Sequence, residues 1–156
     1  MKQLLISASL IFTIFACGDA GNDGAATSSS ESTPPSSSTP AYDTARGKGK
    51  FTDVEISPTL DVAKAEAGEK VYDVKCSSCH KLSAERLVGP GWTGVTERNS
   101  AAWIMNFVTN VDEMLQQDPK AQSQLEVCLV RMPNQNLTDD DARNVYEFMR
   151  QNDGVK

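Results

Sequence analysis

The sequence predicts an all-α domain over residues 58–156, preceded by a short apolar leader and a polar tether. Within that range apolar residues recur at helical intervals, first from Leu60 to Val74 and again in later stretches. Before residue 58 an apolar run over 4–16 gives way to a Ser/Thr/Pro-rich stretch over 18–42. A length of 156 residues fits one domain with a tail.

Four helical segments are expected in the domain. Ser57-Pro58 has the form of an N-cap with proline at the first helical position, so the first helix is expected to begin there. Ser100 caps a middle helix over 100–109, and a helix or helix pair over 111–130 is broken near Asp118-Pro119. Thr138 caps the last helix, with three aspartates in its first turn.

Composition excludes one class of partner. The formal net charge of -6 disfavours binding to nucleic acid, which needs a basic face to neutralise phosphates. An acidic surface can steer the chain toward a basic partner. Only 39% of the residues are hydrophobic, so we expect a cofactor that also serves as part of the core.

The leader, residues 1–16, is expected to be a lipoprotein signal peptide. Its apolar run is too short to span a bilayer, which needs roughly 20 residues. Ile14-Phe15-Ala16-Cys17 resembles a bacterial lipobox, in which the cysteine after the cleavage point takes the lipid. We therefore expect an exported, periplasm-facing lipoprotein anchored through Cys17; ordinary cleavage nearby, leaving a free thiol, is the alternative.

Residues 17–57 are expected to form the lipidated cysteine and a flexible linker. The stretch after Cys17 has no apolar periodicity, and as a coil it would reach on the order of 35 Å. Phe51, Val54 and Ile56 near its end suggest an extended strip packed against the domain.

Cys76-Ser77-Ser78-Cys79-His80 is a C-x-x-C-H motif, the signature of covalent haem attachment. On one helical turn the two thiols share a face and His80 projects beside them toward the iron. A tetrahedral zinc site would need four ligands, and a redox C-x-x-C would expect a βαβ environment. Because His80 is the only histidine, a second axial ligand must be another residue type.

Met132 is the expected second ligand, since methionine is usual in single-haem electron carriers. Pro133 biases it toward an extended conformation, whereas Met105, Met114 and Met149 have the helical spacing of core residues. Met114 is the next candidate.

The order of C-x-x-C-H motif, Met-Pro and capped terminal helix resembles the class I cytochromes c, over roughly residues 58–153. The resemblance implies one covalently attached haem c per chain, held by Cys76 and Cys79. It also implies that the first and last helices cross around the haem, with Gly68 allowing close approach. By the same resemblance, the carbonyl of Pro90 accepts the His80 Nδ1 proton, and Trp92 lines the haem. A hydrogen bond from Trp103 to a haem propionate competes there with a plain core role.

The expected function is therefore single-electron transfer rather than enzymatic catalysis. Expected partners are redox proteins, with a quinol-oxidising complex as donor and a terminal oxidase or other reductase as acceptor. Two alternatives remain open: a five-coordinate catalytic or sensing haem protein, and a fixed subunit of an oxidase or reductase complex. Cys128 is either a buried thiol or a site for an intermolecular disulfide.

Overall fold

The computed structural model describes residues 42–156. The expected signal peptide, Cys17 and most of the expected linker lie outside these residues. The described chain contains six helices: α1 (Val62–Lys75), α2 (Val95–Arg98), α3 (Ala101–Thr109), α4 (Val111–Gln117), α5 (Pro119–Cys128) and α6 (Asp139–Asn152). No helix of residues 42–156 has the length and apolar character needed to cross a membrane.

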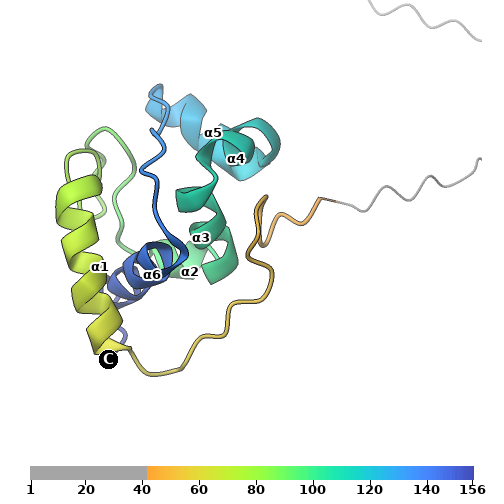
Figure 1. Ribbon diagram of the computed structural model, residues 1–156. Coiled ribbons are helices and arrows are strands. Elements are labelled where there is room, and N and C mark those ends of the chain that lie inside the picture. The colour runs from red at the N-terminus through yellow and green to blue at the C-terminus, as the bar shows by residue number, and fades with distance from the viewer. Residues whose placement is uncertain (1–41) are drawn as a thin grey trace, which may run out of the picture. The chain divides into compact units, whose positions relative to one another are not determined.

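The first and last helices form the most extensive helix–helix contact of the described chain. Figure 1 shows α1 and α6 side by side at different inclinations, with α4 and α5 at the other end of the domain. Gly68 of α1 faces Asn144 and Phe148 of α6, so the expected role of this glycine in close helix approach is confirmed. The all-α fold with packed terminal helices is likewise confirmed.

The helix starts depend on local caps. Ser100 accepts a hydrogen bond from the Trp103 N–H and Thr138 accepts one from the Asp141 N–H, so both expected caps are confirmed. The Asp141 carboxylate in turn accepts the Thr138 N–H, which completes a capping box. Asp118 caps α5 with Pro119 at its first position, which explains why the 111–130 region divides there.

The expected start of the first helix at Ser57-Pro58 is wrong. The N-cap of α1 is Asp61, whose carboxylate accepts the Lys64 N–H at 3.1 Å. The Ser57 carbonyl instead accepts a hydrogen bond from Arg150 of α6, at 2.7 Å. Residue 57 is therefore part of a long-range contact, which the local Ser-Pro signal does not reveal.

The segment before α1 is packed along the domain. In Figure 1 it runs past α3 before it reaches α1. Phe51, Val54 and Ile56 contact the core, as the sequence suggested for an extended strip. Asn106 of α3, which is fully buried, bonds both the N–H and the carbonyl of Phe51. We call residues 43–57 the strap; this part of the range assigned to the linker is thus held against the helices.

Candidate functional site

A central cavity of about 310 Å³ lies between α1, α3, α6 and the segment that precedes α6. It collects every pocket residue that the sequence predicted within the described chain: Cys76, Cys79, His80, Pro90, Trp92, Trp103 and Met132. These residues come from positions up to 56 apart in the chain, so only folding brings them together.

The two cysteines follow directly from the end of α1. Cys76 is its C-cap, and the His80 N–H bonds the Cys76 carbonyl at 2.9 Å, so one further turn carries the motif. Cys76 is buried, and this burial raises the pKa of its thiol to about 11. The Cys76 thiol is therefore enclosed in the domain, and Cys79 beside it is half-buried.

A loop over 81–93 holds the His80 ring in place. His80 Nδ1 lies 2.9 Å from the Pro90 carbonyl oxygen. A carbonyl can only accept, so Nδ1 carries the proton and the lone pair is on Nε2. Burial lowers the pKa of His80, while the bond to Pro90 opposes this shift; the neutral ring is the form that binds a metal.

Gly89 is required beside this ring. A Cβ atom at position 89 would lie 2.3 Å from His80 Cε1, closer than any side chain can approach. The Gly89 N–H also bonds the Cys79 carbonyl at 2.9 Å, which fixes the loop to the motif. The resemblance implied a role for Pro90 in this loop but none for Gly89.

An aromatic cluster forms the wall beneath the motif. Trp92 is buried, and its ring centroid lies 4.8 Å from that of Tyr72 and 6.4 Å from that of Phe148. The Tyr72 hydroxyl donates to the His80 carbonyl at 2.7 Å. Trp92 thus ties the loop to α1 and α6, and the Tyr72 hydroxyl restrains the His80 backbone.

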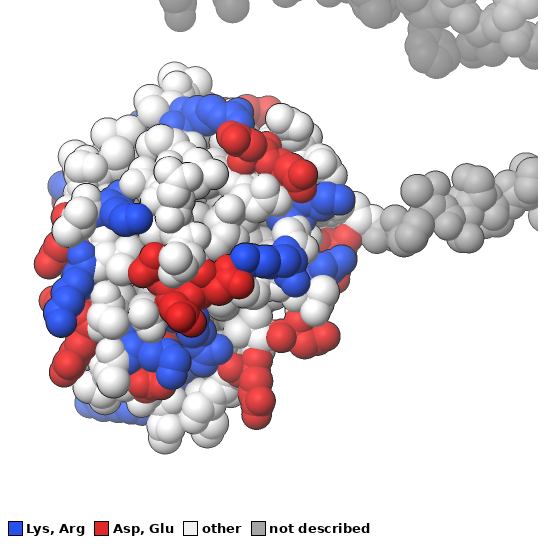
Figure 2. Space-filling view, viewed as in Figure 1, with Lys and Arg blue, Asp and Glu red and all other residues white. Residues whose placement is uncertain are grey.

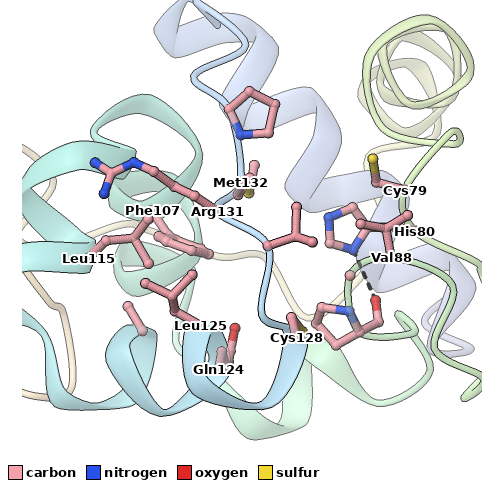
Figure 3. Close-up of a pocket in the computed structure, with 15 residues that line it drawn as sticks. Cys79, His80, Val88, Phe107, Leu115, Gln124, Leu125, Cys128, Arg131 and Met132 are labelled. Atoms are coloured by element: carbon pink, nitrogen blue, oxygen red, sulfur yellow. Dashed lines mark hydrogen bonds between the residues drawn. The ribbon is translucent and has the colours of Figure 1, made fainter.

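Met132 lines the cavity from a different segment of the chain than His80. It lies in the extended segment between α5 and α6, is half-buried, and lines the central cavity. Figure 3 shows a smaller adjoining pocket that Met132 and His80 both line, each entering from its own segment. The thioether and the imidazole are therefore available to the same space.

Met114, the alternative ligand, does not reach this space. It is fully buried, its sulfur accepts the Lys48 N–H at 2.9 Å, and it packs against the strap at Gly47. Met149 of α6 lines the central cavity from a helix face and belongs to the apolar core.

Two polar atoms at the cavity have no partner within the described residues. Trp103 is 3% exposed and its indole Nε1–H lacks an acceptor, and Asn99 Oδ1 lacks a donor. A buried indole N–H usually finds an acceptor. Trp103 also lines the cavity, so its N–H can donate to a ligand that carries an anionic oxygen such as a carboxylate.

The chemistry of this donor set fits haem c. Two thiols for thioether links, a neutral imidazole, a thioether sulfur and an unpartnered indole N–H surround one apolar cavity. No group of three or more His, Cys, Asp or Glu side chains able to hold a bare metal ion occurs within residues 42–156.

Several lining residues were not found from the sequence. Arg98 is the last residue of the short helix α2, Asn99 follows it, and Gln124 comes from α5. No local motif marks them, because their place depends on how α2 and α5 pack. Cys128, which the sequence left unassigned, is half-buried and lines the adjoining pocket of Figure 3.

Comparisons with known proteins identify the family and support the fold. The cytochrome c family model matches residues 65–153. A cytochrome c from Rhodothermus marinus superposes with a TM-score of 0.65 at 30% identity, over 67% of this chain and 90% of that chain. An engineered form of that cytochrome, bound to a carbene intermediate, superposes with a TM-score of 0.62.

A curated relative adds a shorter match. The cytochrome c-type cyt cy of Rhodobacter capsulatus is 38% identical over 48 residues, which are 31% of this chain and 24% of that protein. This chain thus spans about a quarter of that relative. The family model matches more than half of the residues, and the donor set of covalent haem attachment surrounds one cavity. The chain therefore belongs to the cytochrome c family, whose members transfer electrons through haem c.

Proposed function

We propose that the chain is a single-electron carrier in which Cys76 and Cys79 hold one haem c and His80 and Met132 bind its iron. The observation that supports this most directly is the shared lining of one cavity by all four side chains. When bound, haem iron exchanges one electron by alternating between the ferric and ferrous states.

His80 is the fixed ligand of the pair. The hydrogen bond from Nδ1 to the Pro90 carbonyl sets the tautomer, leaves Nε2 free to bind, and makes the ring more basic. Gly89 and Trp92 restrict the ring on two sides.

Met132 is the adaptable ligand. Its long, flexible side chain stands on an extended segment, and a thioether sulfur stabilises the ferrous state and raises the reduction potential. The apolar walls around it act in the same direction, because they disfavour the additional charge of the ferric state. The proposed carrier therefore has a fairly positive reduction potential and no open coordination position for a substrate.

The absorption spectrum of the ferric protein, produced in a host that attaches haem c, tests the ligand pair. The parent should show a far-red methionine-to-iron charge-transfer band, and Met132→Ala should lose it and bind carbon monoxide rapidly when reduced. Met114→Leu is the matched control; it removes the rival sulfur, conserves volume, and should keep the band. A parent without the band, or one that binds carbon monoxide rapidly, would favour a five-coordinate catalytic or sensing protein.

We further propose the domain plan and location that the sequence suggests. Residues 1–16 form a signal peptide, residues 17–57 carry the lipid at Cys17, the linker and the strap, and residues 58–156 form the cytochrome domain. The lipobox-like sequence at Cys17 supports a periplasm-facing lipoprotein, and the donor and acceptor are membrane or periplasmic redox proteins. Metabolic labelling with palmitate, lost in Cys17→Ser, tests the anchor. Purification at fixed stoichiometry with an oxidase or reductase would instead indicate a bound subunit.

A further inference from the structure

The short helix α2 has no capping side chain of its own. Its N-cap is Gly94, whose φ of 70° lies in the left-handed region. Asp153, directly after α6, supplies the missing cap. Its carboxylate accepts the Gly94 N–H at 2.6 Å, the Thr96 N–H at 2.9 Å and the Thr96 hydroxyl at 2.6 Å. Gly94 and Asp153 are 59 positions apart, so the end of one helix caps the start of another.

The Asp153 carboxylate is engaged in this contact alone among its charged options. It is half-buried, and it forms no ion pair within residues 42–156. Hydrogen bonds to an ionised carboxylate are shorter and stronger than those between neutral groups. Figure 1 shows α2 beside α6, and the two helices are in contact. The carboxylate therefore fixes α2 to α6 and does not serve to neutralise a cation.

The same end of α6 also holds the 81–93 loop. The Asn152 side-chain amide donates to the Leu82 carbonyl at 3.1 Å, and the Thr93 hydroxyl donates to the same carbonyl at 3.0 Å. Leu82 and Thr93 lie near the two ends of this loop, which holds the imidazole ring of the motif. Asn152 and Asp153 thus anchor both the loop and the helix that follows it.

The position of α2 sets the orientation of Asn99. Asn99 is the C-cap of α2 and is 7% exposed, and its Nδ2 donates to the Val95 carbonyl at 2.9 Å. Because this end of the amide is bonded to α2, the other end, Oδ1, is left at the central cavity without a donor. The direction of this oxygen therefore depends on where α2 lies.

Trp103 is coupled to α2 through a short connection. The helix α2 ends at Arg98 and α3 begins at Ala101, and Ser100 between them accepts the Trp103 N–H at 3.0 Å. A shift of α2 is therefore passed on to the first turn of α3, which carries Trp103 and its unpartnered Nε1–H. Both unpartnered polar atoms at the cavity thus belong to the segment that Asp153 anchors.

From these contacts we infer that Asp153 is a positioning residue of the electron-transfer site, which caps α2 so that Asn99 and Trp103 stay in place at the cavity wall. This inference rests on the proposed function as an electron carrier. If α2 is loosened, water gains access to the wall, and water stabilises the additional charge of the ferric state. Loss of the cap should therefore lower the reduction potential.

A redox titration of the holoprotein tests this role. Asp153→Ala should lower the reduction potential. Thr96→Val removes one of the three donors at nearly constant volume and should lower it by less, whereas Thr96→Ser keeps the hydroxyl and should retain the parent value. Because the Thr96 hydroxyl bonds Asp153, the double variant Asp153→Ala/Thr96→Val should have the potential of Asp153→Ala alone.

A matched control separates positioning from the loss of charge and of stability. Figure 2 shows acidic and basic side chains interspersed on the face that it presents, so removal of any carboxylate alters a mixed surface field. Asp61→Ala also removes a half-buried carboxylate that caps a helix, and Asp61 lines neither the central cavity nor the adjoining pocket. This variant should leave the reduction potential close to that of the parent.

NMR spectroscopy of the ferrous holoprotein gives a second readout. In Asp153→Ala the amide hydrogens of Gly94 and Thr96 should exchange roughly ten to a hundred times faster, because each loses a bond to a charged acceptor. The indole N–H resonance of Trp103 should shift. Neither change is expected in Asp61→Ala.

Three outcomes would overturn the inference: an Asp153→Ala holoprotein with the parent potential, an equal shift in Asp61→Ala, or additive shifts in the double variant. Should Asp153→Ala yield no folded protein, equal potentials in Thr96→Val and Thr96→Ser would overturn it. A parent without haem absorption would overturn the proposed function itself, whereas haem-loaded variants with an unchanged potential would overturn this inference alone.

Discussion

Gly68 of α1 lies directly against Asn144 of α6, so closely that a Cβ atom at position 68 would be 2.0 Å from the Asn144 carbonyl oxygen. The same Cβ would lie 2.9 Å from the Cβ of Phe148. The absence of a side chain at one position therefore sets the distance between the two terminal helices. The helix α1 leads directly into the motif, and α6 supplies Val145 and Met149 to the cavity wall.

Replacing Gly68 by alanine should lower stability. Alanine gains about 1 kcal/mol of helix propensity, but the clash with α6 backbone forces the helices apart, and we expect a net loss of about 2 kcal/mol. Guanidinium unfolding of the holoprotein, followed by tryptophan fluorescence, measures it. Glu69→Ala, at an exposed position of the same helix, is the control and should change little. A variant as stable as the parent would show that α1 and α6 can separate without cost.

Gly89→Ala should disturb the proposed His80 ligand. The added methyl group would displace the imidazole and weaken its bond to Pro90, because it would lie 2.3 Å from Cε1 and 2.8 Å from Nδ1. We expect a lower yield of haem-loaded protein and a shifted reduction potential. Gly91→Ala disturbs the same loop, because its Cβ would meet the Ser83 carbonyl at 2.1 Å and not the His80 ring, so it measures the effect of loop distortion alone. Equal potentials in Gly89→Ala and the parent would contradict the prediction.

Asn106→Ala should release the strap. The Asn106 amide donates to the carbonyls of Arg46 and Phe51 at 2.9 and 2.8 Å, and accepts the Phe51 N–H at 2.9 Å. Loss of these buried bonds should cost roughly 2 to 3 kcal/mol. The strap should then be cleaved faster in limited proteolysis. Asn110→Ala removes a more exposed amide, whose bond to Lys48 is 3.4 Å long, and should leave the cleavage rate unchanged.

Asp61 should give a pH-dependent contribution to the stability of α1. Hydrogen bonds from the Lys64 side chain and backbone hold the pKa of the Asp61 carboxyl below its ordinary value of 3.8. A lowered folded-state pKa means that this contribution is present above the unfolded-state pKa and is lost as pH falls through the folded-state value.

The Asp61 pKa can be read from the carboxyl carbon shift in an NMR titration. Lys64→Gln should raise it toward 3.8, because the largest cause of the shift is the Lys64 side chain. Lys70→Gln, on the same helix, should not alter it. A titration of Asp61 that is identical in Lys64→Gln and the parent would show that the cap does not depend on this pair.

Local signals predicted the helices well where a side chain caps its own helix. Ser100, Asp118 and Thr138 each bond an N–H three residues later, and these contacts are encoded within a single turn. The start of α1 was predicted wrongly because Ser57 and Pro58 carry the same signal as a true cap, while the Ser57 carbonyl is in fact bonded by Arg150, 93 residues away. The short helix α2 was not predicted, since Gly94 before it adopts a left-handed conformation and offers no side-chain cap.

The sequence alone predicts the covalent chemistry, because two thiols and an imidazole on adjacent turns form one local unit. It also indicated Met132 through Pro133, a purely local restraint on the backbone. Three features become visible only in the folded domain: Met114 packs against the strap, Trp103 lines the cavity with an unpartnered N–H, and Asp153 caps α2. These features depend on contacts between residues that are distant in the chain. Such contacts arise from packing, so helical periodicity does not predict them.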